Sequence, residues 1–321
     1  MKALARKTLF ALTAVALVAG TAACTNTESP AAVSGNAPSG SASAPTGVGA
    51  GGRAAAGAVK ADPAVQALVP DAFKSKGTLQ LVTDPTYAPI DFTDDQGNIV
   101  GLEPDLAVAA ANKMGLKVNF NKGDFNGIIA GIQARRYDAS WAAFSVTADR
   151  EQQVNMVSYQ NAGTAIMVKH GNPDKVAQVT DLCGKTVAAQ TGTTQALTDL
   201  PTFQKQCSDA GKPQITELIL PQQDNVNQAV QTGRAAAMAA DNALVAYYSQ
   251  LQPDLFSQVD SILVDTAPEA VIVHKEDTAL AKAFKAAIDS LIADGTYGKI
   301  MGAWNLGSSK VTSAAVNPAA S

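Results

Sequence analysis

The chain has 321 residues, a hydrophobic content of 46% and a formal net charge of −4. An acidic balance without a basic stripe argues against a nucleic-acid-binding protein, and no apolar run is long enough to span a bilayer comfortably. From about residue 60 to residue 307 the aliphatic content supports a sizeable core, and the length of this stretch suits two compact lobes better than one.

The first 23 residues have the layout of an export signal. A positively charged start and an apolar run at residues 9–18 lead to small residues at 21–23, directly before Cys24. This order resembles a bacterial lipoprotein signal, in which the thiol of Cys24 takes a diacylglycerol. It predicts an extracytoplasmic protein held on the cell membrane by a lipid anchor. Ordinary cleavage, which would release a free secreted protein, is the alternative.

Low-complexity segments flank the folded region. Residues 24–60 consist almost entirely of Ala, Gly, Ser, Pro, Thr and Asn, without one aromatic side chain. Such a segment buries too little apolar surface to offset the entropy of ordering, so we expect a flexible tether. Residues 308–321 return to low complexity and are expected to form a disordered tail.

The cysteine count points to one disulfide. If Cys24 carries lipid, Cys183 and Cys207 remain as an even pair in an oxidising compartment. A bond between them would stabilise the fold by roughly 3 kcal/mol, and two buried free thiols are the alternative. A catalytic thiol is not expected, because the only histidines are His170 and His274.

Strand and helix patterns alternate through the first half of the folded region. The predicted strands are residues 78–83, 117–121 and 137–143, and the predicted helices begin near residues 103 and 126. Two prolines within residues 84–89 force an irregular loop after the first strand. This alternation predicts a parallel α/β sheet.

The same alternation restarts in the second half. The predicted strands are residues 186–190, 214–220, 235–240 and 270–274. One predicted helix follows the turn 191–194, and two more span residues 225–232 and 278–293. We therefore expect two α/β lobes, with the C-terminal segment returning to the first. Ligands of open α/β sheets bind beyond the carboxyl ends of strands. Those ends carry Asp84, Ser145, Thr191 and Asp241.

Three features near those strand ends could hold a small ionic ligand. Arg150 could grip a carboxylate through two parallel hydrogen bonds, and a surface ion pair is the alternative. The turn 191–194 precedes a helix, so its N–H groups could hold an anion or simply cap the helix. Asp241 could neutralise an ammonium group or cap the helix that follows it.

Two aromatic residues could enclose a ligand, and the sequence contains no recognisable set of catalytic residues. Tyr87 and Phe125 lie just beyond predicted strands, where their rings could enclose a ligand or fill the core, and Trp141 is assigned to the core. The sequence has no histidine partner for a nucleophile, no zinc-spaced Cys or His pair, and no GxGxxG after the first strand. We therefore expect no catalytic residue, no metal and no cofactor.

The sequence contains six short motifs in a characteristic order and at characteristic spacings. They are Asp84-Pro-Thr-Tyr87-Ala-Pro, Gly101-Leu-Glu-Pro-Asp105-Leu-Ala, Asp124-Phe125-Asn-Gly-Ile-Ile, the segment from Tyr137-Asp138 through Ser145-Val-Thr147 to Arg150, Gln190-Thr-Gly-Thr-Thr-Gln195, and Ala240-Asp241. Together they resemble family 3 of the bacterial extracellular solute-binding proteins, which deliver polar amino acids to ABC importers. The resemblance covers residues 77–307.

The resemblance implies an α/β, two-lobed periplasmic-binding-protein fold of type II. Each lobe would contain a mostly parallel sheet with flanking helices, and two crossing hinge strands would join the lobes. Lobe 1 would comprise residues 75–164 and 270–307, and lobe 2 residues 165–269.

The resemblance also implies how the two charges of an amino acid would be held. Arg150 would bind the ligand α-carboxylate together with the N–H groups of Thr193 and Thr194. Asp241 would pair with the α-ammonium group, helped by Ser145.

Five further residues would complete this ligand site. A main-chain carbonyl near Ala142 or Ala143 would assist at the ammonium group. Tyr87 and Phe125 would stack on the ligand side chain, and Asp84 would lie where the identity of that side chain is read.

The implied function is that of a monomeric, lipid-anchored subunit that binds a polar L-amino acid, cationic ones included, and delivers it to ABC permease transmembrane subunits by lobe closure. Two alternatives stay open. An enzyme on the same scaffold, such as a dehydratase of cyclic acids, would need an uncompensated acid in the cleft, and Asp84 or Glu269 could serve. A ligand-sensing subunit would share the same sequence features.

Overall fold

Two long antiparallel strands, β7 (Val154–Lys169) and β11 (Phe256–His274), run through the centre of an eight-stranded sheet. The computed structural model describes residues 48–318, so the predicted signal at 1–23, Cys24 and the first part of the predicted tether lie outside the described residues. The strand order is β5-β1-β6-β11-β7-β10-β8-β9. The other strands are β1 (Thr78–Thr83), β5 (Lys117–Lys122), β6 (Ala139–Ser145), β8 (Thr186–Gln190), β9 (Thr216–Leu220) and β10 (Ala237–Asp241).

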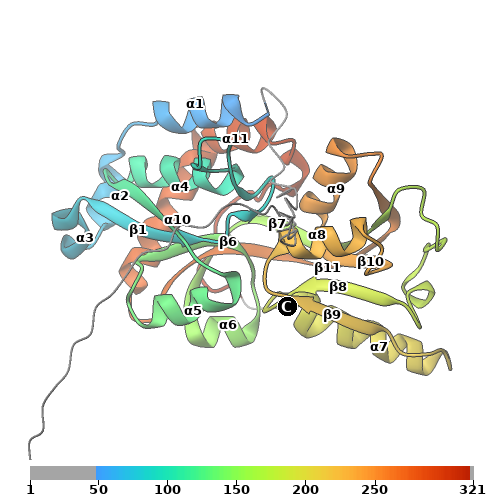
Figure 1. Ribbon diagram of the computed structural model, residues 1–321. Helices are drawn as coiled ribbons and strands as arrows, with labels where there is room; N and C mark the ends of the chain where they lie inside the picture. The colour runs from blue at the N-terminus through green and yellow to red at the C-terminus, as the bar shows by residue number, and fades with distance from the viewer. Residues whose placement is uncertain (1–47, 319–321) are drawn as a thin grey trace, which may run out of the picture. The chain divides into compact units, whose positions relative to one another are not determined.

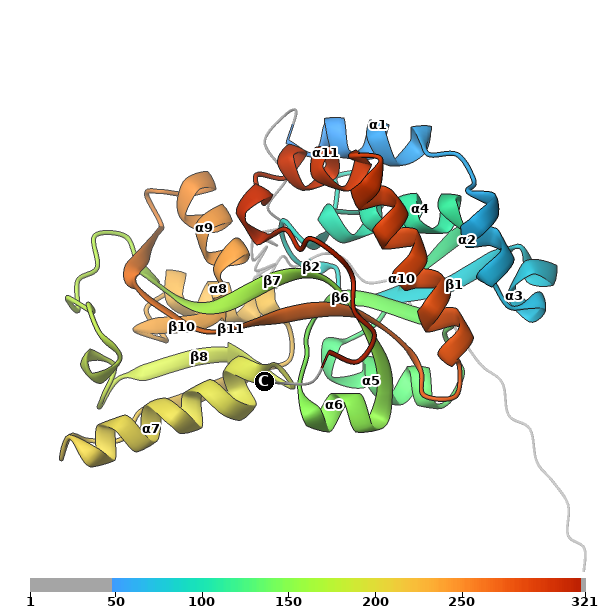
Figure 2. The same cartoon turned by 180° about the vertical axis from the view of Figure 1, so that it is seen from behind.

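The two long strands belong to both ends of the sheet. β7 pairs with β11 from Val154↔His274 to Lys169↔Phe256, while β6 pairs with the C-terminal part of β11 and β10 with the C-terminal part of β7. At each end of the sheet the strands outside this central pair run parallel. Figures 1 and 2 show β7 and β11 crossing from the β1 end to the β8 end. The predicted two-lobed α/β fold with two crossing strands is thereby confirmed.

Helices cover both faces of the sheet at each end (Figures 1 and 2). At the β1 end they are α1 (Ala50–Ala58), α2 (Pro63–Leu68), α3 (Asp71–Lys76), α4 (Leu102–Lys113), α5 (Phe125–Gln133), α6 (Ala148–Gln153), α10 (Thr278–Ala293) and α11 (Thr296–Ala303), and at the β8 end α7 (Leu200–Asp209), α8 (Gln223–Gln231) and α9 (Asn242–Leu251). Their apolar faces follow the sequence period: α10 buries Leu280, Phe284, Ala287 and Leu291. Within residues 48–318 no helix combines the length and apolarity needed to cross a membrane.

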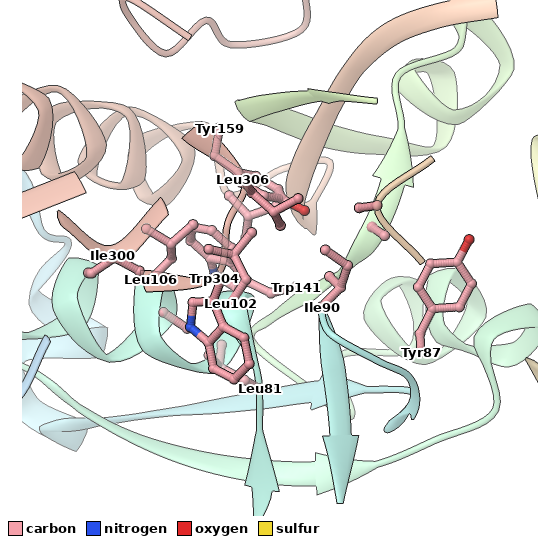
Figure 3. Close-up of a cluster of buried hydrophobic side chains, with 14 of the residues drawn as sticks. Leu81, Tyr87, Ile90, Leu102, Leu106, Trp141, Tyr159, Ile300, Trp304 and Leu306 are labelled. Atoms are coloured by element: carbon pink, nitrogen blue, oxygen red, sulfur yellow. The ribbon is translucent and has the colours of Figure 1, made fainter. Parts of the chain in front are cut away.

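The largest apolar cluster joins α4, α11 and β6 (Figure 3). Trp141 is 1% exposed, and its ring lies 4.7 Å from that of Tyr159, in agreement with its assignment to the core. Trp304 packs edge-on against Phe92, and its Nε1 donates a hydrogen bond of 2.8 Å to Asp105. Tyr87 lies at the margin of the cluster in Figure 3, with its hydroxyl directed away from the other labelled side chains.

A small three-stranded sheet, β2 (Thr86–Tyr87), β3 (Asp91–Thr93) and β4 (Ile99–Val100), holds the loop after β1. Tyr87 pairs with Asp91 in this sheet. Gly101, just before α4, has a φ of 145°, and a Cβ atom there would lie 2.0 Å from the carbonyl oxygen of Ile90. Glycine at this position therefore permits the close approach that fixes β2 and β3 beside the end of β1.

The predicted tether is wrong for its last part, because residues 50–58 form the helix α1. α1 packs against α11 and α4, and Ala56 is 1% exposed. Gly52 allows this contact, since a Cβ atom there would lie 2.8 Å from a carboxylate oxygen of Asp105. Alanine has the highest helix propensity and needs little space, so a segment of small residues can pack closely where larger side chains could not. The tether was predicted from the lack of large apolar side chains, which does not reveal packing between small ones.

The predicted disordered tail is also wrong for residues 308–318. This segment lies along β7, where the N–H of Ser158 donates to the carbonyl of Ala315 and the N–H of Asn317 donates to that of Met156. In return the side chain of Asn317 accepts from the N–H of Met156 at 2.8 Å, and that of Ser158 accepts from the N–H of Ala315 at 2.9 Å. Backbone pairing at a free strand edge requires no apolar side chains, so low complexity did not reveal it.

Removing residues 308–321 is expected to lower the free energy of unfolding by about 2 kcal/mol, because the four hydrogen bonds to β7 are worth about 1 kcal/mol each before the entropy of ordering is subtracted. Denaturant unfolding followed by circular dichroism measures the change. A chain that ends at Pro318 serves as the matched control. Equal midpoints for all three chains would contradict a structural role for this segment.

The structure joins Cys183 to Cys207, as predicted. The bond connects the turn before β8 with α7, and Cys207 is fully buried among the apolar residues of this lobe. The two residues are 24 positions apart in the sequence, so the disulfide closes a loop whose freedom in the unfolded chain is reduced.

Candidate functional site

A cavity lies where the carboxyl ends of β1, β6, β8 and β10 converge, and its empty space of about 360 Å³ includes space that is open to solvent. Its lining consists of Asp84, Tyr87, Asp91, Phe125, Ala142, Ala143, Ser145, Arg150, Gln190, Thr193, Thr194, Gln195 and Asp241. All ten residues that the sequence analysis assigned to a ligand site are therefore brought together around one space.

Arg150 provides the positive charge of this cavity. The hydroxyl of Thr147 caps the short helix α6 by accepting from the N–H of Arg150, which places the guanidinium beneath the end of β6. The guanidinium donates to the carbonyl of Ser145 at 2.7 Å and to that of Gly192 at 3.0 Å. It also lies over Phe125, 5.7 Å from the ring centre. Burial lowers the pKa of Arg150 to about 10, which leaves it cationic at neutral pH.

Asp241, at the end of β10, provides a buried negative charge opposite. One carboxylate oxygen accepts from the amide of Gln195 at 2.8 Å, and the other accepts from the hydroxyl of Tyr87 at 2.8 Å. The tyrosine hydroxyl in turn accepts from the N–H of Asp241. Burial raises the pKa of this carboxyl, while the hydrogen bonds and the attraction of Arg150 act in the opposite direction.

Asp84, at the end of β1, is held by three donors. One oxygen accepts from the hydroxyl of Thr86 at 2.9 Å, and the other accepts from the N–H of Phe125 at 3.1 Å and the amide of Gln190 at 2.7 Å. Burial raises the pKa of Asp84, and these hydrogen bonds oppose that effect. The carboxylate thus has a fixed orientation at the edge of the cavity.

Several of these contacts connect the two ends of the sheet directly. Tyr87 reaches Asp241, and Asp84 reaches Gln190. The hydroxyl of Thr194 lies 3.3 Å from that of Ser145. The cavity is therefore enclosed by side chains from both lobes.

The turn after β8 differs from its expected form. A π-helical turn, η2 (Gln195–Asp199), precedes α7, and the hydroxyl of Thr193 donates to the carbonyl of Gln190 at 2.8 Å. Thr193 and Thr194 line the cavity as predicted. The π-helical turn aims Gln195 inward, where it reaches Asp241.

Ala142 and Ala143 lie where β6 departs from regular geometry. Ala143 has a φ of 49°, and its N–H turns to donate to a carboxylate oxygen of Glu103 at 2.8 Å. The pairing of β6 with β11 shifts register nearby, between Ala270 and Ile272. This bulge exposes the backbone of β6 to the cavity, although both side chains are only methyl groups.

Sequence reasoning missed Asp91, Gln190 and Gln195 as lining residues. The two glutamines flank a turn that was recognised, so their amides could have been counted with it. Asp91 is 1% exposed, and neither of its carboxylate oxygens has a hydrogen-bond partner among residues 48–318. Burial raises its pKa well above the usual range, and repulsion from Glu103 adds to this effect. Only the antiparallel pairing of β2 with β3 turns Asp91 toward the cavity.

Comparisons with known proteins show which proteins the chain is similar to. The model of the bacterial extracellular solute-binding proteins, family 3, matches residues 79–307. The arginine-binding protein ArgT of Corynebacterium glutamicum is 29% identical over 255 residues, which cover 79% of this chain and 83% of ArgT.

Two solved structures extend the comparison. An ancestral arginine-binding protein bound to arginine is 33% identical, with a TM-score of 0.64 over 71% of this chain and 98% of that one. An ancestral amino acid-binding protein, described as a precursor of cyclohexadienyl dehydratase, is 29% identical, with a TM-score of 0.60 over 73% of this chain and 98% of that one.

Proposed function

Because the chain belongs to the bacterial extracellular solute-binding proteins of family 3, we propose that it binds a polar L-amino acid outside the membrane and delivers it to an ABC importer. One observation carries this function: a buried guanidinium, Arg150, and a buried carboxyl, Asp241, line the same enclosed cavity from opposite lobes. An amino acid presents one negative and one positive group on adjacent atoms. Arg150 takes the α-carboxylate with the N–H groups of Thr193 and Thr194, and Asp241 takes the α-ammonium.

The remaining lining residues receive the rest of the ligand. Ser145 and a main-chain carbonyl near Ala142 or Ala143 assist at the ammonium group. Tyr87 and Phe125 enclose the ligand side chain, and Asp84 reads its identity. These assignments come from the family resemblance, and the lining of one cavity by all of these residues supports them.

The charge of the cavity favours a cationic ligand side chain. Asp84 and Asp241 line it together with Asp91, and Arg150 is the one cationic side chain that lines it among residues 48–318. Because Arg150 and Asp241 take the two charges of the amino-acid backbone, Asp84 is left to accept hydrogen bonds from a cationic side chain, such as a guanidinium. ArgT and the ancestral protein bound to arginine point to the same ligand class.

Lobe closure couples binding to delivery. Residues 75–164 with 270–307 form one lobe and residues 165–269 the other, and β7 and β11 serve as the hinge. Ligand contacts from both lobes stabilise the closed form, which permease subunits distinguish from the open one. The segment 1–23 directs export, and a lipid on Cys24 keeps the monomeric protein beside its permease. The sequence order of this segment and the extracellular family support that location.

Catalysis is not part of the proposed function. An enzyme of the dehydratase kind would need an uncompensated acid facing the ligand. Both oxygens of Asp84 accept hydrogen bonds and Glu269 does not line the cavity, so Asp91 is the lining acid that such an enzyme would have to use. Turnover of a prephenate-like cyclic acid by the purified protein would overturn this conclusion.

Calorimetric titration with L-arginine, L-lysine, L-histidine and L-glutamine tests the function. We expect micromolar or tighter binding of at least one cationic amino acid. Replacing Asp84 with asparagine should weaken binding of L-arginine by about tenfold and affect L-glutamine much less, since the charge that faces a cationic side chain is lost. Asp260→Asn, at an exposed position of β11, is the matched control. Failure of every amino acid to bind better than millimolar would refute the function.

A further inference from the structure

A second buried acid, Glu269, stands beside Asp241 without lining the cavity. It belongs to β11, where it pairs with Gln160 of β7 on one side and with Ser145 of β6 on the other. Its side chain is 1% exposed. One carboxyl oxygen accepts a hydrogen bond from the amide of Gln160, whereas the other meets no donor among the described residues.

The surroundings of Glu269 disfavour a second negative charge. Besides Asp241 of β10, the acid Glu103 of α4 faces it, and so do the hydroxyl-bearing Tyr87 and Tyr159, both of which are buried. Arg150 is the cation that faces this group, and it is shared with Asp241. Two neighbouring buried carboxylates repel one another unless one of them carries a proton.

We propose that Glu269 keeps its proton at neutral pH in the ligand-free protein and donates it in a hydrogen bond to Asp241, so that it positions this carboxylate before the ligand's ammonium group arrives. The inference rests on the ligand role proposed for Asp241. It accounts for the unpartnered oxygen of Glu269, which becomes a donor once protonated. Burial raises the pKa of Glu269 well above the usual range, and repulsion from Asp241 and Glu103 adds to the effect of burial.

Ligand binding should then release a proton. The ammonium group brings a positive charge next to the Asp241–Glu269 pair, and a neighbouring cation lowers the pKa of an acid. The pair therefore has a lower pKa in the complex than in the free protein. Affinity rises with pH between these two values and is constant below both.

Titration with L-arginine between pH 6 and pH 8, in buffers of different ionisation enthalpy, measures the released proton. We expect the wild type to release protons and to bind more tightly as pH rises. Glu269→Gln, whose amide can still donate to Asp241, should keep the affinity within about twofold at pH 6 and release no proton. Glu269→Ala should lose about fivefold in affinity, the usual effect of one hydrogen bond. The control Asp260→Asn should behave as the wild type.

Two results would overturn the proposal. One is a Glu269→Gln variant that folds normally but binds as weakly as Glu269→Ala, since this would mean that the site uses an ionised Glu269. The other comes from carbon-13 NMR of the ligand-free protein, in which Glu269→Gln identifies the carboxyl signal of Glu269. An ionised carboxyl at pH 7 would refute the proposal even if no amino acid bound, so its failure is separate from failure of the proposed function.

Discussion

Replacing Arg150 with alanine is expected to weaken binding of L-arginine by between about 30-fold and several thousand-fold. Removing one partner of a buried charge pair costs about 2–5 kcal/mol, because the other charge stays buried without a partner. Arg150 is 8% exposed, so water cannot readily replace the guanidinium. Its bonds to the carbonyls of Ser145 and Gly192 hold it at this place.

Lysine at this position should restore only part of the affinity. It keeps the positive charge but cannot reach both carbonyls and present two parallel N–H groups to a carboxylate. Calorimetry on Arg150→Ala and Arg150→Lys measures both effects, and Arg234→Ala, an exposed arginine after α8, is the control. If Arg150→Ala kept its affinity within about threefold, the carboxylate would have to bind elsewhere.

Asp241→Asn is expected to reduce affinity for L-arginine by about 100-fold or more and to stabilise the ligand-free protein. The loss arises because asparagine has the shape of aspartate without the charge that the ammonium group needs. Calorimetry measures the affinity, and thermal unfolding with and without ligand measures the stability. Asp260→Asn again serves as the control.

The gain in stability follows from the direction of the pKa shift. Burial raises the pKa of Asp241 in the folded protein above its value in the unfolded chain. The folded state therefore binds the carboxyl proton of Asp241 more tightly than the unfolded state does. The contribution of Asp241 to stability is greatest below the pKa of the unfolded chain, and it falls as pH rises through the pKa of the folded protein. At neutral pH asparagine removes that unfavourable charge. An equal or lower melting temperature for ligand-free Asp241→Asn at pH 7 would contradict this reasoning.

Local sequence patterns were sufficient to predict the strands whose ends carry the site. β1, β6, β8 and β10 fall within a few residues of their predicted ranges, because runs of β-branched and small apolar residues between turns leave few alternatives. Parallel strands place their carboxyl ends at one edge, so Asp84, Ser145 and Asp241 could be grouped in advance. Motif spacing supplied Arg150 and the Thr193–Thr194 pair.

Long-range geometry decided what local patterns could not. Asp91 reaches the cavity because β3 folds back onto β2, and Glu269 is buried where it interacts with Asp241 because β11 runs between β6 and β7. Neither residue has a distinctive neighbour in the sequence. The helix α1 and the C-terminal segment also escaped prediction, since both are ordered by contacts with distant elements and not by their own apolar content.

The sequence by itself determined the class of fold through periodicity and the disulfide partners through the cysteine count, and the resemblance of its motifs to a known family supplied the ten residues around the cavity. Only the tertiary structure decided how the charges are distributed. It surrounds one guanidinium with several buried carboxyls, and the protonation of such groups depends on burial and on neighbours that lie far away in the chain. That distribution is the basis of the proposed preference for a cationic ligand and of the proposed proton beside Asp241.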